Sequence, residues 1–172
     1  MKDQKGFTLI ELIVILGLTT IVMGAVMSFF IANYRSYNRI NTESELQYQS
    51  QYIINFMTDK ILGTNQIVSV NRNSDIDQHN EKVINYISFQ YGPDDTKCYN
   101  FEIKNNQLYY SDGEVNEAGS SDIGGSFDEL ILKITPLNNS FSNANSIKIK
   151  LELKNRNQEY TAEQIIYMRN SQ

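Results

Sequence analysis

Residues 5–35 read KGFTLIELIVILGLTTIVMGAVMSFFIANYR, and this stretch decides the fold of the N-terminal part of the chain. Between Phe7 and Ala32 every residue is apolar, small or hydroxylated except Glu11. A run of about 26 such residues is long enough to cross a bilayer as a helix at about 1.5 Å per residue. A carboxylate in that run costs about 2.5 kcal/mol or more to bury in lipid. The presence of Glu11 in the apolar run therefore calls for a specific explanation.

The residues that flank the apolar run predict its orientation in a membrane. Lys2 and Lys5 precede it, so the positive-inside rule keeps the N-terminus in the cytoplasm and sends the rest of the chain outward. The run is longer than the core of a secretory signal, and no clear small-x-small cleavage site ends it. Composition alone therefore indicates a single-pass membrane anchor.

The residues KGFTLIEL, at positions 5–12, resemble the class III signal of type IV prepilins and type II secretion pseudopilins. The resemblance implies a leader, residues 1–6, that a prepilin peptidase removes by cutting after Gly6 on the cytoplasmic side. It also implies that the same enzyme methylates the new N-terminal residue, Phe7. Glu11 would then pair, in the filament core, with the α-amino group of Phe7 in a neighbouring subunit, because a buried charge is tolerable once it is paired.

Beyond Ala32 the apolar residues follow the period of an amphipathic helix. The apolar stripe consists of Leu46, Ile53, Met57 and Ile61, widened by Ile54 and Phe56, while Gln47, Gln49, Gln51 and Thr58 fall mainly on the other side. Gly63 stands where a helix C-cap is expected. The pattern predicts one helix of about 55 residues, with an apolar membrane and filament-core half over residues 7–32 and an amphipathic half over residues 33–63.

After Gly63 the period changes to two, which is typical of strands. Strands are predicted at residues 66–70, 82–91, 97–104, 107–111, 129–135, 146–153 and 160–168. Asn105 and Asn106 predict a tight hairpin, since Asn tolerates positive φ. Together with the resemblance, the pattern predicts an α+β pilin fold, in which the long N-terminal helix packs on a C-terminal antiparallel β-sheet domain over residues 64–172.

The sequence offers little for catalysis or metal binding. Its single histidine, His79, and single cysteine, Cys98, cannot assemble a catalytic set, so we expect no enzymatic activity and no cofactor. Cys98 is expected to be a buried thiol. Asp75, Asp77, His79 and Glu81 place donor atoms at every second position, but they lack the glycine and the spacing of an EF-hand loop. A solvated acidic loop is the preferred interpretation of this weak candidate cation site.

Charge is unevenly distributed along the chain, whose formal net charge is −5. Residues 71–129 carry twelve acids against four cations, whereas residues 130–172 carry six cations against three acids. The second region contains Lys148, Lys150, Lys154 and Arg156, and alternation places the three lysines on one face of a strand. Such a row matches the phosphate spacing of nucleic acid and is a candidate site for extracellular DNA. The alternative is that these lysines decorate an edge or surface strand and prevent aggregation.

Two further segments, INFMTDKI at 54–61 and the closing IIYMRN at 165–170, resemble the J-type pseudopilins and the W-type minor pilins. The resemblance implies a minor pilin that helps initiate a type IV pilus and sits at or near its tip. Its implied partners are the prepilin peptidase, the major pilin, other minor pilins and the cytoplasmic membrane. Before assembly the chain would span that membrane once, and afterwards it would lie in the extracellular filament.

Two other functions stay open at the level of sequence. One is a pilus-displayed module that captures extracellular DNA or a surface ligand for adhesion, biofilm formation or uptake. The other is a minor pseudopilin of a type II secretion system.

Overall fold

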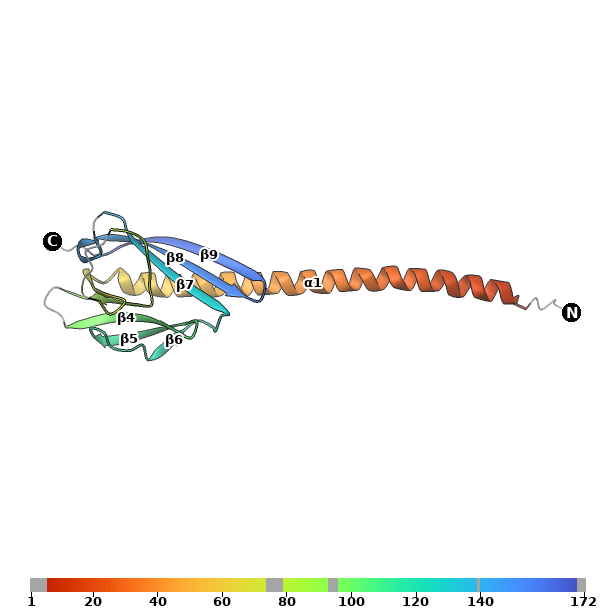
Figure 1. Cartoon of the computed structure of the whole chain (residues 1–172), viewed down its shortest axis with the longest axis horizontal. Helices are drawn as coiled ribbons and strands as arrows, with labels where there is room; N and C mark the ends of the chain where they lie inside the picture. The colour runs from red at the N-terminus through yellow and green to blue at the C-terminus, as the bar shows by residue number, and fades with distance from the viewer. Residues whose placement is uncertain (1–5, 74–78, 93–95, 139, 170–172) are drawn as a thin grey trace. The chain divides into compact units, whose positions relative to one another are not determined.

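The computed structural model describes residues 6–73, 79–92, 96–138 and 140–169. The chain divides into two compact units, Met1–Asn41 and Thr42–Gln172. Helix α1, Leu9–Ile61, is 53 residues long and contributes to both units (Figure 1). Its length agrees with the predicted helix of about 55 residues.

In the first unit the apolar side chains of α1 are exposed. Their exposed fractions run from 44% at Val26 to 78% at Phe7, just before the helix. Within the described residues, α1 is the one helix that is long and apolar enough to cross a membrane. A continuous apolar surface of this kind needs a lipid or protein environment.

The second unit contains two antiparallel sheets. Sheet A has the order β1-β3-β4-β5-β6, with β1 at Gln66–Val70, β3 at Tyr86–Gln90, β4 at Lys97–Lys104, β5 at Gln107–Glu114 and β6 at Ser121–Ile123. Sheet B has the order β2-β7-β8-β9, with β2 at Lys82–Val83, β7 at Glu129–Pro136, β8 at Ser146–Asn155 and β9 at Gln158–Tyr167. A short 3₁₀ helix, η1, spans Phe141–Asn143. Figure 1 shows β7, β8 and β9 side by side, with β4, β5 and β6 as a second group.

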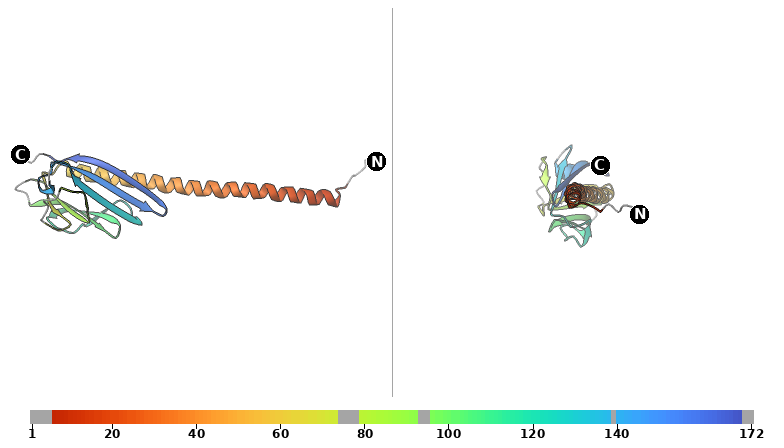
Figure 2. Two further views of the ribbon diagram at one scale, coloured as in Figure 1. Left: turned by 45° about the horizontal axis from the view of Figure 1, so that its top comes forward. Right: turned by 90° about the vertical axis from the view of Figure 1, so that its right-hand side faces the viewer.

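One hydrophobic core joins the C-terminal part of α1 to both sheets, and Figure 2 shows that end of the helix beside the strands. The predicted apolar stripe is confirmed, since Leu46, Ile53, Met57 and Ile61 are each at most 1% exposed. Alternation in β8 is confirmed as well, because the apolar residues at 147, 149, 151 and 153 are at most 1% exposed.

Two polar residues of α1 do not lie on the solvent side, where the sequence pattern placed them. The Oε1 atom of Gln49 accepts a hydrogen bond from the backbone N–H of Gly125 at 3.2 Å. The Oγ1 atom of Thr58 is buried, and the described residues offer it no hydrogen-bond partner. The helix therefore buries a wider face than its apolar stripe.

The predicted strand at residues 82–91 is wrong as a single element, because the chain changes sheets within it. Ile84 N–H donates to Leu132 O at 2.8 Å in sheet B, and Asn85 O accepts from Ile103 N–H at 2.8 Å in sheet A. Asn71 holds the crossing, since its Oδ1 atom accepts from Asn85 N–H at 2.7 Å. Residues on both sides continue the period-two pattern, so the sequence carries no sign of the change.

The turns confirm one prediction and correct others. Asn105 and Asn106 have φ values of 52° and 56° between the paired residues Lys104 and Gln107, which is the predicted hairpin. Gly63 is not a left-handed cap. Instead the Thr64 hydroxyl donates to Ile61 O at 2.7 Å, and this bond helps to close the end of α1. β6 and η1 lie between the predicted strands, where the sequence pattern predicted no element.

Candidate functional site

The N-terminus of α1 is closed by a complete capping box. Thr8 precedes the helix, and its backbone N–H and hydroxyl both donate to Glu11 Oε2, at 2.9 and 2.8 Å. In return the backbone N–H of Glu11 donates to Thr8 Oγ1 at 3.4 Å. A threonine followed three residues later by a glutamate is the pattern that satisfies two of the free N–H groups at a helix start. Gly6, Phe7 and Thr8 lie outside the helix and are exposed.

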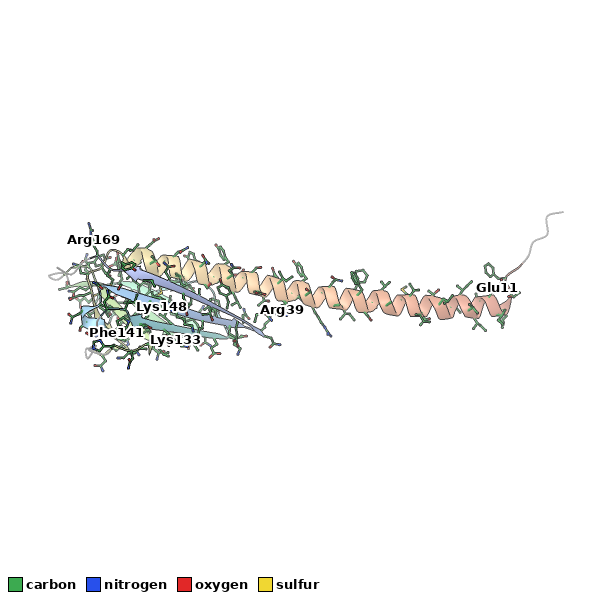
Figure 3. All side chains as sticks on the ribbon, turned by 90° about the horizontal axis from the view of Figure 1, so that it is seen from above. Glu11, Arg39, Lys133, Phe141, Lys148 and Arg169 are labelled. Carbon is green, nitrogen blue, oxygen red and sulfur yellow. The ribbon has the colours of Figure 1, made fainter. Side chains whose placement is uncertain are left out.

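This geometry gives Glu11 a partner within its own chain, which the sequence reasoning missed although the Thr-x-x-Glu signal was present. Figure 3 shows Glu11 in the first turns of α1. Both hydrogen bonds from Thr8 reach Oε2, so among the described residues Oε1 has no partner. The second oxygen is therefore open to a cation from outside the chain. Pairing with Phe7 of a neighbouring subunit stays a prediction.

The three predicted lysines of β8 do share the outward face of sheet B. Lys148 pairs with Glu163 at 2.6 Å, Lys150 with Glu152 at 3.1 Å, and Lys154 with Glu159 at 3.0 Å. Arg156 lies beyond the strand, in the β8–β9 turn, where its φ is 56° and its backbone N–H donates to Asp128 Oδ2 at 2.6 Å. The three lysines thus share one strand face as predicted, and the backbone of Arg156 lies outside that strand.

Charge on this face is balanced in the part of sheet B that the structure describes. Its ion pairs join four lysines to four glutamates: Lys133, Lys148, Lys150 and Lys154 with Glu129, Glu152, Glu159 and Glu163. Hydrogen bonds from Lys133 and Lys150 lower the pKa of Glu152, and the bond to Glu152 raises the pKa of Lys150. A nucleic-acid phosphate must therefore compete with a carboxylate at each lysine. DNA binding by this face stays a prediction.

The strand's place in the sheet excludes the edge form of the alternative interpretation and leaves the surface form as a prediction. β8 lies between β7 and β9, so its lysines do not guard a sheet edge. They belong to a cross-strand network of opposite charges, and such pairs stabilise a sheet modestly.

The candidate cation loop is only partly within the described residues. Asp75 and Asp77 lie outside them, while His79 and Glu81 are described and exposed. Over the described ranges no group of three or more metal-ligating side chains is found. Cys98 is fully buried, as predicted.

A cluster that the sequence did not reveal lies at the C-terminal end of α1. The Lys60 ammonium group lies 5.0 Å from the centroid of Tyr99, 5.3 Å from that of Tyr110 and 5.6 Å from that of Phe56. The rings of Phe56 and Tyr110 meet edge to face at 5.2 Å. We call these four residues the Lys60 cage. A cation within about 6 Å of an aromatic face is attracted by its quadrupole, so the cage ties α1 to β4 and β5.

The closing segment of the chain, of which residues 165–169 are described, lies near the residues that follow this end of the helix. Lys60 and Ile61 end the INFMTDKI segment, and Thr64 O accepts a hydrogen bond from Arg169 N–H of the closing segment at 3.0 Å. Met168 N–H donates to Asn145 O at 2.8 Å. Met168 and Arg169 are thus held by backbone hydrogen bonds, the second of them to a residue just beyond α1.

Comparison with known proteins bears on the N-terminus. A family model described as the prokaryotic N-terminal methylation motif matches residues 1–27. Comparisons with curated proteins and with solved structures give no significant match. The motif supports a type IV pilin or pseudopilin, a structural subunit whose precursor is anchored in the membrane. The N-terminal segment of this chain is therefore a methylation motif consistent with the class III signal peptide of type IV prepilins and pseudopilins.

Proposed function

We propose that the chain is a minor pilin of a type IV pilus that helps initiate assembly and sits at or near the filament tip. The observation that carries this proposal is the methylation motif at residues 1–27, continuous with an exposed apolar helix and followed by a β domain. Such a chain is built to leave the bilayer by packing its apolar helix against those of other subunits.

The first step is processing at the N-terminus. Prepilin peptidase cuts after Gly6, and methyl transfer to the nitrogen of Phe7 follows. Support comes from the position of the bond, since residues 6–8 precede the first turn of α1 and are exposed. A protease needs an extended substrate backbone, which a helix does not offer.

The second step is recruitment into the filament. The new α-amino group, with a pKa of about 8, is protonated at neutral pH. Glu11 of an adjacent subunit neutralises it in the filament core, because two opposite charges are far less costly to bury than one. The free Oε1 atom of the capped Glu11 supports this step, since the carboxylate can accept a new partner without leaving its own helix cap.

The minor-pilin role and the tip location rest on the resemblance to J-type pseudopilins and W-type minor pilins. Arg169 of the IIYMRN segment donates to Thr64 O, three residues after the INFMTDKI segment, and this proximity supports a common structural reason for both. The resemblance implies the same signal, helix and β domain for a minor pseudopilin of a type II secretion system. An experiment is therefore needed to separate the minor pilin from the minor pseudopilin.

The test is deletion of the gene in its own cells, with complementation by the native chain and by Glu11→Ala. We expect loss or strong reduction of surface pili, restored by the native chain alone, with immunogold label at filament ends. Normal pili together with a secretion defect indicate the pseudopilin. Normal pili with lost DNA or surface attachment indicate a displayed binding module, although the paired lysines of sheet B do not favour it.

A further inference from the structure

We propose that Tyr34, Arg35, Tyr37 and Arg39 form a basic, aromatic anchor. This outer anchor binds the phosphate groups of anionic lipids at the outward-facing surface of the cytoplasmic membrane. Basic residues flank the apolar span on both sides, in the leader and in the outer anchor. We further propose that removal of the leader leaves the outer anchor as the stronger of these two membrane-binding flanks. The inference rests on the proposed processing and membrane insertion of the chain. It assigns a ligand class to a surface of α1 that the processing steps do not involve.

Helix length places the outer anchor at the correct depth. From Leu9 to Ala32 the helix advances about 35 Å, slightly more than the hydrocarbon core of about 30 Å. When the N-terminal end of α1 lies at the inner surface, Tyr34 and the residues after it reach the headgroups on the opposite side. The apolar span and the anchor are continuous within the first unit.

The side chains have the chemistry of a membrane interface. Tyr34 and Tyr37 are each 68% exposed, and tyrosine is enriched where the hydrocarbon core meets the headgroups. Arg35 and Arg39 are four residues apart on one face of α1, and both are exposed. Figure 3 shows Arg39 projecting from the helix. A guanidinium group binds phosphate in a bidentate manner.

Among the residues that the structure describes, no carboxylate is paired with either arginine. Over the described ranges neither forms an ion pair within 4.0 Å, whereas every lysine on the outward face of β8 does. Glu43 stands four residues beyond Arg39 on the same helix face, yet no ion pair within 4.0 Å joins these two described residues. Two free cations beside an apolar span complement an anionic surface better than they complement this chain.

The charge balance across the span changes on processing. In the full chain, Lys2 and Lys5 on the cytoplasmic side oppose Arg35 and Arg39 on the outer side, two basic residues each. Cleavage after Gly6 removes both lysines and leaves the α-amino group of Phe7, four residues from the carboxylate of Glu11. The processed helix thus keeps its outer basic residues and loses the two inner lysines, whose charges would otherwise have to cross the bilayer when the helix moves outward.

The test uses the full chain and its peptidase-processed form in nanodiscs, with spin-labelled phosphatidylglycerol and phosphatidylcholine as probes. We expect the native processed chain to prefer the anionic lipid by about 3- to 10-fold in low salt, since each arginine contributes up to about fivefold at an anionic surface. The preference should fall to near one in Arg35→Gln/Arg39→Gln. It should be unchanged in the matched control Lys148→Gln/Lys150→Gln.

A second measurement follows the depth of the helix. Cys98 is fully buried, so a cysteine introduced by Ser36→Cys is the reactive thiol. Its labelling by a polar maleimide should accelerate after leader removal, and this acceleration should be absent in Arg35→Gln/Arg39→Gln. An anionic preference that survives in that double variant overturns the proposal. The proposal is also overturned if Arg35→Gln/Arg39→Gln keeps the native lipid preference but its cells lose pili. That result assigns the two arginines to contacts between subunits. Failure of the peptidase to cut the native chain refutes the proposed processing instead, and the lipid preference of the full chain still tests the anchor.

Discussion

Replacement of Lys60 by methionine tests whether the Lys60 cage holds α1 on sheet A. Methionine keeps most of the length and the apolar stem but removes the charge. Three ring centroids lie 5.0 to 5.6 Å from the ammonium group. Cation–π contacts contribute about 0.5–1 kcal/mol at exposed sites and about 2 kcal/mol when desolvated. The cage is half-buried and its rings share one cation, so we expect Lys60→Met to lower the free energy of unfolding by about 1–2 kcal/mol.

The assay is thermal unfolding of the full chain in mild detergent, followed by near-ultraviolet circular dichroism of the tyrosines. A loss of about 1 kcal/mol corresponds to about 2–4 °C in Tm for a domain near this size. Lys60→Arg should retain most of the stability, because guanidinium groups also stack on aromatic faces. Lys154→Met is the matched control and should change the stability less than Lys60→Met does, since its ion pairs are exposed. A Lys60→Met protein as stable as the control would refute the reasoning.

Further changes test other parts of the structure. Thr8→Val should weaken the helix cap by about 1 kcal/mol, visible as faster amide exchange in the first turn of α1. Thr8→Ser and Glu11→Gln retain the capping pattern and should not accelerate this exchange. If Glu11→Gln is nevertheless lost from filaments and Thr8→Ser is not, assembly requires the charge of Glu11 and not only its cap. The pKa of Glu152 is lowered in the folded state, so its ion pairs contribute stability that is present above the ordinary value of 4.5 and is lost as the pH falls through the folded-state pKa. The fall in Tm on acidification should therefore be smaller in Glu152→Gln than in the native chain. An equal fall in both contradicts the ion-pair network. Asn105→Ala should destabilise the hairpin by about 1 kcal/mol because its φ is 52°, while Asn105→Gly should not, as thermal melts will show. Duplex DNA titrated with the native chain at low salt should show little binding, since the outward lysines of β8 are paired. Tight binding, with a slope near −3 for the logarithm of the binding constant against the logarithm of the salt concentration, would support the predicted DNA site instead.

Local periodicity was sufficient for the elements in which one face is buried along the whole length. The apolar stripe of α1 from Leu46 to Ile61 and the alternation of β8 were both predictable, because each side chain's environment follows from its position in the repeat. The hairpin at Asn105 was predictable for the same reason, since the turn residues themselves set the backbone.

Features that depend on residues distant in sequence were not predictable. The change of sheet at Ile84 is set by Asn71 and by strands β4 and β7, which lie far along the chain. The Lys60 cage gathers rings from α1, β4 and β5. The pairing of the β8 lysines depends on glutamates of β7, β8 and β9. In each case the sequence supplied the residue types, and the tertiary fold decided which of them meet.

The most direct test of the proposed processing is the mass of the N-terminal peptide of this chain, isolated from membranes and from sheared filaments of its own cells. We predict that the peptide begins at Phe7 and carries one N-methyl group, with the unprocessed form confined to the membrane fraction. In Gly6→Val the peptide should begin at Met1 in the membrane preparation, and no peptide of this chain should be recovered from the sheared filaments. A native chain that keeps Met1, or that is cut beyond Glu11, would contradict its processing as a type IV prepilin.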